Sequence, residues 1–204
     1  MSKVTEVELR GPVKHSDVGT LKGKLEGKGV LKETKNRILI DYTTFLEGET
    51  VEGRTKDIRI RNTNGTSEII IKTGKWGGSD VRDEFKVQTN GSFDSLVKVM
   101  DLFGYTKGVL CVRNSEVYQL EEVEISLVEV PGHSYYFEAE IETEDSVESE
   151  ALRSKIETIV SELGLNTFSD NEFYAYIKRL NEEANTVFDS TVESADFFHT
   201  NFKI

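Results

Sequence analysis

The sequence has few of the residues that crosslink small secreted proteins or bind soft metals. It contains one cysteine, Cys111, which permits no disulfide bond within the chain and fits a reducing compartment. The three histidines lie far apart, without a paired histidine or cysteine, so a zinc site is not expected. We therefore expect the chemistry of this protein to depend on oxygen and nitrogen side chains.

Long apolar runs are also missing. The longest aliphatic run, residues 69–71, is far shorter than the roughly 20 residues that span a bilayer. The first residues do not resemble a signal peptide, and no P-loop or nucleophile-elbow motif occurs. These absences predict a cytoplasmic protein that does not bind membranes.

The charge balance is acidic and uneven. The 204 residues carry 25 Lys and Arg against 37 Asp and Glu, a net charge of −12, which argues against a nucleic-acid partner bound through bulk charge. From Glu138 onwards there are 5 basic and 16 acidic residues, whereas the preceding residues are balanced at 20 and 21. The balanced part suits a site for anions and cations together, and the acidic end suits a solvated helical surface.

Periodicity predicts an antiparallel α+β protein. Alternating polar and apolar residues predict eight strands, joined mostly by short turns, and no parallel βαβ pattern occurs. Helical spacing predicts four helices, over residues 16–27, 92–103, 148–163 and 169–183. The predicted strands cover residues 4–12, 30–45, 57–61, 67–73, 80–88, 107–114, 117–128 and 134–142.

The polar faces of these strands carry ions of both signs. For any one strand, a face open to water is a sufficient explanation. For all strands together, closing the sheet would turn this face inward and remove the sheet edges. The sequence therefore predicts a closed antiparallel eight-stranded β-barrel, or tunnel, with a charged interior and surrounding amphipathic helices. The ionic residues are Glu6, Glu8, Arg10, Arg59, Arg61, Lys72, Arg82, Glu84, Lys86, Arg113, Glu122, Glu124, Glu138, Glu140 and Glu142.

A hydrated interior with both charges fits a polyphosphate bound together with a divalent metal. Arginine and lysine bind phosphate oxygens through charge-assisted hydrogen bonds. Carboxylates bind Mg²⁺ or Mn²⁺, which prefer oxygen ligands and bridge to phosphates.

Several short motifs, in order, resemble those of the CYTH superfamily, the triphosphate tunnel metalloenzymes. This superfamily includes inorganic triphosphatase, thiamine triphosphatase and class IV adenylate cyclase. The resemblance covers roughly residues 4–185 and implies one CYTH-like domain over residues 1–204, with the barrel at roughly 3–143 and a helical segment and tail at 146–204. The motifs are Glu6-Val7-Glu8-Leu9-Arg10, Ile58-Arg59-Ile60-Arg61, Ile71-Lys72, Val81-Arg82-Asp83-Glu84, Cys111-Val112-Arg113 and Phe137-Glu138-Ala139-Glu140.

The resemblance also implies roles for individual residues. It places Arg10 among the phosphate-binding bases, and we assign Arg10 a catalytic position there. Independently of the resemblance, Glu84 lies between Arg82 and Lys86, where it would orient the attacking water or form an internal ion pair. The implied ligands of Mg²⁺ or Mn²⁺ are Glu6, Glu8, Glu138 and Glu140. The implied phosphate-binding residues are Arg59, Arg61, Lys72, Arg82 and Arg113.

Three departures from the family pattern bear on these roles. Arg10 stands where the family usually has lysine, and an arginine fork does not replace a lysine point charge in proton transfer. Val128 stands where many members have an aspartate, so that either Glu124 or Glu129 replaces it as a metal ligand or one metal site is weakened. His133-Ser134 replaces a Leu-Gly pair.

The resemblance implies metal-dependent hydrolysis of a triphosphate, either inorganic tripolyphosphate or an organic or nucleoside triphosphate. The alternatives are conversion of ATP to cyclic AMP and a module that binds polyphosphate or nucleotide without turnover. The expected partner is a small-molecule triphosphate or polyphosphate, and a homodimer is left open.

Three further features have two explanations each. Cys111 beside Arg113 is either a thiol with a lowered pKa or an inert packed residue. Trp76 either stacks on an organic ring or packs on its own scaffold. The segment 46–56 is predicted to be a mobile loop, and the aromatic tail after Phe188 is predicted to pack back on the body.

Overall fold

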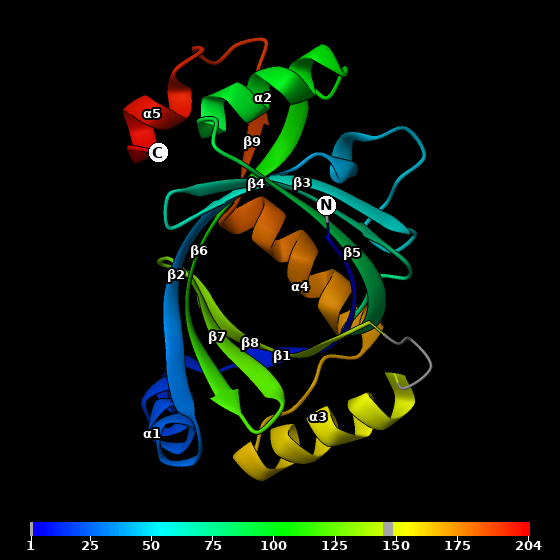
Figure 1. Cartoon of the computed structure of the whole chain (residues 1–204), viewed down its shortest axis with the longest axis vertical. Coiled ribbons are helices and arrows are strands. Elements are labelled where there is room, and N and C mark those ends of the chain that lie inside the picture. The colour runs from blue at the N-terminus through cyan, green and yellow to red at the C-terminus, as the bar shows by residue number, and fades with distance from the viewer. Residues whose placement is uncertain (1, 145–148) are drawn as a thin grey trace.

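Eight antiparallel strands form a closed barrel in the computed structural model, which describes residues 2–144 and 149–204. The pairing order is β2-β3-β4-β5-β1-β8-β7-β6, and β2 also pairs with β6, which closes the ring (Figure 1). This confirms the predicted fold class. The strands are β1 (Ser2–Val13), β2 (Val30–Asp41), β3 (Lys56–Thr63), β4 (Thr66–Thr73), β5 (Ser79–Thr89), β6 (Lys107–Leu120), β7 (Val123–Val130) and β8 (Ser134–Thr143).

Helices lie on opposite sides of this barrel. In Figure 1, α1 and α3 lie below the barrel, α2 and α5 lie above it, and α4 is seen through its opening. A short ninth strand, β9, extends the sheet beside β6. The bounds are α1 (Val18–Lys28), α2 (Phe93–Leu102), α3 (Ser149–Leu163), α4 (Asp170–Glu183), β9 (Thr186–Asp189) and α5 (Phe197–Phe202), with 3₁₀ turns at His15–Asp17 and Thr43–Phe45. No helix in the described ranges is long and apolar enough to cross a membrane.

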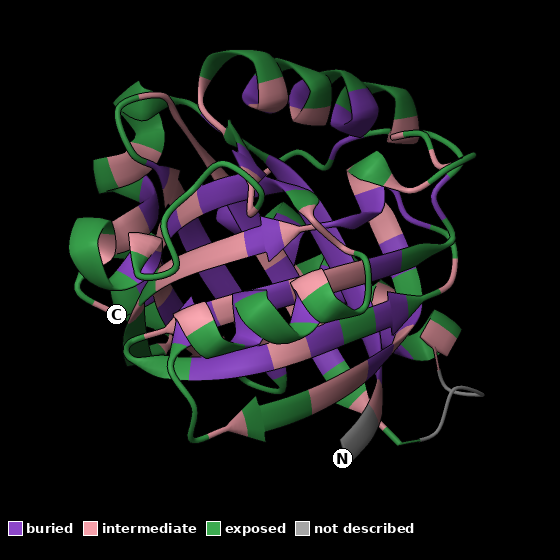
Figure 2. Cartoon of the chain, turned by 90° about the horizontal axis from the view of Figure 1, so that it is seen from above, coloured by how far each residue is buried: buried purple, intermediate pink, exposed green. Residues whose placement is uncertain are grey.

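Two hydrophobic clusters lie outside the barrel wall, under the helices, and a third surrounds α4 with Trp76 and Phe168. One cluster joins β1, β7 and β8 to α1 and α3, with Phe137 and Ile156 fully buried at its centre. A second cluster joins β2 and β3 to α2 and α5, where Phe93 packs on Phe198. Figure 2 shows the strands mostly buried and the outer sides of the helices exposed. Successive residues of a strand face opposite sides of the sheet, so the residues between these apolar ones point into the barrel, and most of them are polar or charged.

Local sequence signals define the element ends. Asn64 and Gly65 have φ of 50° and 90°, the left-handed conformations that a tight hairpin between β3 and β4 requires. The Ser92 hydroxyl accepts a hydrogen bond from the Ser95 amide at 3.2 Å and caps α2. Ser169 and Glu172 form a capping box at the start of α4.

Several predicted boundaries are wrong. The strand predicted over 30–45 ends at Asp41, and a 3₁₀ turn follows it. The turn between the strands predicted over 107–114 and 117–128 lies later than predicted. The first strand continues to Leu120, the chain turns at residues 121–122, where Glu121 has a φ of 53°, and the next strand starts at Val123. The alternating pattern runs through the supposed break at residues 115–116, because the chain continues there as one strand.

The remaining differences concern helices and loops. Phe103 follows α2 as its C-cap and is 74% exposed, so it does not belong to the buried stripe of that helix. The start predicted at Glu148 lies outside the described residues. The end of the predicted mobile loop is anchored, because buried Arg54 donates to Asp41 and Asp57, each at 2.6 Å. The tail does pack back, through Phe188 and Phe198 in the second core cluster.

Candidate functional site

The strand register turns the predicted ionic residues toward the barrel interior. Glu6 lies opposite Arg82, Glu8 opposite Glu140 and Arg10 opposite Glu138 on neighbouring strands. The same parity, continued around the ring, places eleven predicted site residues on the inner face. They are Glu6, Glu8, Arg10, Arg59, Arg61, Lys72, Arg82, Glu84, Arg113, Glu138 and Glu140. Glu122, expected on this face, instead lies in the β6–β7 turn and pairs with Lys155 on the outside.

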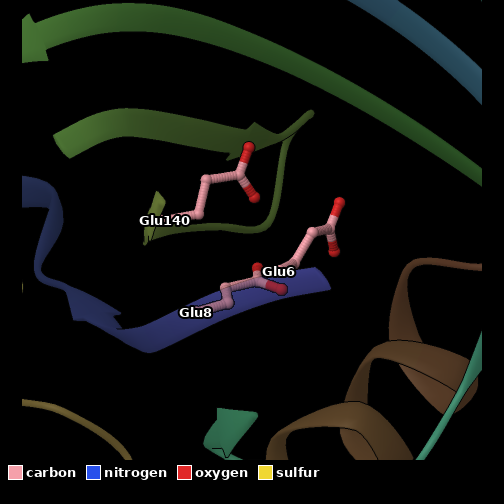
Figure 3. A group of neighbouring side chains, drawn as sticks. All are labelled: Glu6, Glu8 and Glu140. Carbon is pink, nitrogen blue, oxygen red and sulfur yellow. The ribbon is translucent and has the colours of Figure 1, made fainter. Parts of the chain in front are cut away.

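Three carboxylates converge inside the barrel. Glu6 and Glu8 from β1 and Glu140 from β8 each offer an oxygen, and these oxygens all lie within 4.8 Å of one another (Figure 3). Burial, together with the charges of Glu138 and Glu6, raises the pKa of Glu8 to about 7. Burial, Glu8 and Glu6 raise the pKa of Glu140 well above its usual range. Three converging carboxyl groups offer the oxygen donors that a hard divalent cation such as Mg²⁺ or Mn²⁺ prefers, and such a cation would relieve their mutual repulsion.

Glu138 lies apart from this group of three and faces basic side chains. One of its oxygens is 3.7 Å from Nε of Arg10. Although burial opposes the effect, Arg10 and Arg37 lower the pKa of Glu138. The fourth predicted metal ligand therefore has its charge compensated by protein cations in this structure.

Arg10 is fully engaged by protein acceptors. Its guanidinium donates to Asp80 at 2.7 Å, to the carbonyl oxygen of Gly77 at 2.9 Å and to Glu8. Burial opposes ionisation, but Glu8 and Asp80 raise the pKa of Arg10 well above its ordinary value. Arg10 therefore stays charged, so it can orient the carboxylates of Glu8 and Asp80 but cannot accept a proton.

Asp57 is a buried counter-ion that the sequence analysis missed. Its carboxylate accepts hydrogen bonds from Arg54, Arg59 and Arg82, each at 2.6 Å. Burial opposes ionisation, yet Arg59 and Arg82 hold the pKa of Asp57 well below its usual range. A signal existed, because Asp57 and Asp80 each lie two residues before an inward arginine and so share its face of the strand.

Some arginine donors have no partner within the described part of the chain. Nε of Arg59 and Nη2 of Arg82 are buried and make no hydrogen bond there. A buried donor without an acceptor costs about 1–3 kcal/mol, more when charged, so a ligand that accepts from these atoms recovers that energy. Asp57 thus aligns two guanidinium groups without using all of their donors.

Glu84 lies between two lysines. Its oxygens are 3.2 Å from Nζ of Lys72 and 3.1 Å from Nζ of Lys86. Burial opposes ionisation, but Lys72 and Arg61 lower the pKa of Glu84. This geometry corresponds to the internal ion pair weighed for Glu84. Lys72 also contacts Glu6, and Arg61 donates to Glu68 at 2.7 Å.

The opposite part of the interior carries two less neutralised arginines. Arg113 donates to the amide oxygen of Asn185 at 2.9 Å, and no acidic group in the described ranges forms an ion pair with it. Arg37, which the sequence analysis missed, faces Arg113 across β2 and β6. Burial and the nearby charge of Arg61 lower the pKa of Arg37. Arg37, Leu39 and Asp41 are spaced two residues apart in the sequence. This period of two could have identified Arg37 as a residue on the inner face.

The register excludes one of the two replacements considered for the aspartate missing at Val128. Glu124 is on the inner face, opposite Glu140, and lies 3.5 Å from lysines 32 and 35. Glu129 is on the outer face, where it accepts hydrogen bonds from Asn114 and Tyr135. Glu129 is therefore excluded as a metal ligand inside the barrel.

Packing decides the roles of Cys111 and Trp76. Cys111 faces the interior, but burial raises the pKa of its thiol to about 11, which excludes an activated thiolate. Trp76 is buried, packs edge-on against Phe173 at a ring distance of 5.0 Å and lies under Arg54. Trp76 therefore packs on its own scaffold, and both residues also line the cavity between the barrel and α4.

The comparisons with known proteins support this architecture. No protein-family model and no curated protein matches the chain. Among solved structures, the PH1819 protein of Pyrococcus horikoshii OT3 is 24% identical, with a TM-score of 0.72 over 87% of this chain and 99% of that one. A proposed adenylate cyclase from Vibrio parahaemolyticus is 17% identical, with a TM-score of 0.57 over 82% and 91% of the two chains.

A third similar structure is HpAC1 from Hippeastrum, proposed as an adenylyl cyclase and described as having a dominant triphosphatase activity. It is 16% identical, with a TM-score of 0.53 over 86% of this chain and 95% of that one. At these identities the likeness concerns the fold. With its ring of eight antiparallel strands around a charged interior, the chain has the CYTH-like fold.

Proposed function

We propose that the protein is a metal-dependent triphosphatase that binds the phosphate chain of its substrate inside the barrel. One observation carries this proposal. Buried arginine donors without acceptors, on Arg59 and Arg82, share an interior with the carboxylates of Glu6, Glu8 and Glu140. A phosphate chain accepts hydrogen bonds, whereas a divalent cation accepts carboxylate ligands, so a metal–triphosphate complex satisfies both groups.

In this proposal the acidic residues bind the metal and the basic residues bind the phosphate chain. Glu6, Glu8 and Glu140 would hold Mg²⁺ or Mn²⁺, and a metal bound there supplies Lewis-acid polarisation of phosphoryl oxygens. The arginines bind phosphate oxygens and stabilise the charge that is redistributed as the terminal phosphoryl group is transferred. Arg10 orients the carboxylate of Glu8. The ion pair with Glu84 positions the ammonium group of Lys72 beside Glu6.

A binding module without turnover is the second candidate, and a specific observation favours it. Asp57 and Asp80 already neutralise much of the charge on Arg10, Arg59 and Arg82. Cations that are compensated in this way stabilise a transition state less than free cations do.

The test is a substrate panel. Tripolyphosphate, thiamine triphosphate, ATP and GTP are each incubated with Mg²⁺ or Mn²⁺, and phosphate, pyrophosphate and cyclic nucleotide are measured. Metal-dependent phosphate release supports the triphosphatase, and cyclic AMP with pyrophosphate from ATP would support a cyclase instead. Tight binding with no product would refute both activities and leave the binding module. The variant Lys28→Ala, which alters an exposed ion pair with Glu162, is the matched control for variants of the interior.

A further inference from the structure

Two residues that depart from the family pattern, His133 and Ser134, belong to a hydrogen-bond chain between the surface and the barrel interior. His133 is the last residue of the β7–β8 turn, and Ser134 starts β8. Tyr176 and Glu183 come from α4, where they lie about two helical turns apart and so share one face of the helix. The side chain of Glu183 is 54% exposed and that of His133 is 18% exposed, whereas Tyr176 is buried. The chain therefore runs from solvent into the protein.

The contacts along this chain are continuous. Nε2 of His133 is 2.8 Å from a carboxylate oxygen of Glu183, and Nδ1 of His133 is 2.7 Å from Oγ of Ser134. Oγ of Ser134 is 2.9 Å from the hydroxyl oxygen of Tyr176. Tyr176 lines the cavity between the barrel and α4, as does Arg113. The inner end of the chain therefore lies at the space that holds a proposed phosphate-binding residue.

With His133 neutral, the partners determine where each hydrogen lies. The carboxylate of Glu183 can only accept, so Nε2 carries the hydrogen of the neutral ring and Nδ1 is an acceptor. The hydroxyl of Ser134 must then donate to Nδ1, and its oxygen accepts from Tyr176. The one hydroxyl hydrogen of Tyr176 is used in the chain, and the interior faces only an oxygen that accepts.

Protonation of His133 reverses every bond between its ring and Tyr176. A proton taken up from solvent at Nδ1 makes this nitrogen a donor to Oγ of Ser134. The hydroxyl of Ser134 then rotates and donates to the oxygen of Tyr176. The hydroxyl hydrogen of Tyr176 is released from the chain, so Tyr176 can donate into the interior.

The charged groups around this chain leave His133 as its titrating member. The guanidinium carbon of Arg179 lies 5.4 Å from the ring centroid of Tyr176, and the charges of Arg113 and Glu138 also act on this tyrosine. Arginine stays protonated, and although burial opposes the effect, neighbouring arginines lower the pKa of Glu138. Burial raises the pKa of Tyr176, so its hydroxyl keeps its hydrogen. Histidine is the side chain whose charge ordinarily changes between pH 5 and 8.

We propose that protonation of His133 turns the hydroxyl hydrogen of Tyr176 into the barrel interior, where it donates to the phosphate chain of the ligand. Tyr176 is then a further phosphate-binding residue, and His133 and Ser134 are its positioning residues. The proposal rests on the proposed function, because that function supplies the phosphate acceptor. A Leu-Gly pair has no side chain that can pass on a hydrogen bond, so this role depends on the departure from the family pattern.

Calorimetry with tripolyphosphate and Mg²⁺ on the full chain compares the wild type with Tyr176→Phe at pH 5.5 and pH 8. Removing the hydroxyl should weaken binding about tenfold at pH 5.5, the effect of one net hydrogen bond, and less than about twofold at pH 8. The ionisations of tripolyphosphate and of Glu8 are common to both proteins and cancel in the ratio of their affinities.

Two background variants separate the hydrogen-bond chain from the charge of His133. Ser134→Ala breaks the chain but keeps the histidine, so Tyr176→Phe should have the same effect at both pH values in this background. His199→Gln, at an exposed position of α5, is the matched control and should keep the wild-type difference between the two pH values. An effect of Tyr176→Phe that does not depend on pH in the wild type, or one that depends on pH equally in Ser134→Ala, would overturn the proposal.

A second measurement needs no ligand. The NMR signal of the Tyr176 ring carbon that bears the hydroxyl, assigned by its loss in Tyr176→Phe, should shift as the His133 ring titrates in the wild type. The same signal should not shift in Ser134→Ala, and an equal shift there would refute the chain. Absence of tripolyphosphate binding at both pH values would refute the proposed function, whereas this signal alone then decides whether His133 controls the hydroxyl of Tyr176.

Discussion

Replacing Glu8 by glutamine should remove a large part of the pH dependence of stability in the metal-free protein. Glu8 is buried, and its pKa is raised from 4.5 to about 7. At about 1.36 kcal/mol per pKa unit, ionising this carboxyl in the folded state costs about 3 kcal/mol relative to the unfolded state. That cost is absent when Glu8 is protonated in both states.

The direction follows from the raised pKa. Below about pH 4.5 both states are protonated and the full stability is present. As the pH rises toward and through 7, the unfolded state ionises first and the stability falls. Wild type and Glu8→Gln should therefore have similar unfolding free energies at pH 5, and the variant should be more stable by about 3 kcal/mol at pH 8.

Urea titrations between pH 5 and 8 in the presence of a chelator measure this difference. Glu162→Gln, at an exposed position paired with Lys28, is the matched control and should follow the wild type. Adding Mg²⁺ should stabilise the wild type more at pH 8 than at pH 5, because metal binding favours the ionised carboxylate. Parallel stability profiles for wild type and Glu8→Gln in chelator would refute the account of this cluster.

The remaining predictions concern turnover and charge balance. Glu6→Gln and Glu140→Gln should each abolish metal-dependent phosphate release while circular dichroism reports an intact fold; full activity would exclude these residues as essential metal ligands. Arg59→Ala and Arg61→Ala should each lower kcat/KM by a hundredfold or more, about 2–4 kcal/mol, and weaken calorimetric binding of tripolyphosphate by less. Asp57→Ala leaves arginines without their shared counter-ion and should destabilise the protein by about 3–5 kcal/mol in urea titrations. Tripolyphosphate should restore part of this loss, and a variant as stable as the wild type would contradict the counter-ion role.

The parity of the strands was predictable from sequence, because alternation with period two determines which residues share a face. The inward positions of Arg59, Lys72 and Glu138 follow from it. The counter-ions Asp57 and Asp80 obey the same rule, although they lie outside the motifs that carry the family resemblance.

Other features depend on contacts between distant segments. The pattern of β6 and β7 does not mark where the chain turns, because Glu121 adopts a left-handed conformation that its residue type does not announce. The separation of Glu138 from the three-carboxylate group depends on the side chains of Arg10 and Arg37, which come from other strands. The cavity under α4 depends on how a helix far from β8 in the chain packs across the barrel, and no local pattern encodes this packing.

Two of the three hydrophobic clusters of the described residues lie outside the barrel wall on opposite sides, and the charged interior separates them. Selection can therefore change the charged lining of the interior without dismantling either of these two clusters, since their apolar residues point away from the ligand. Only the third cluster, which includes Phe173 and Tyr176 of α4, faces the interior cavity. The two clusters are joined mainly through the hydrogen-bonded strands that surround the interior. Such a scaffold allows the chemistry inside it to diverge while its architecture is inherited unchanged.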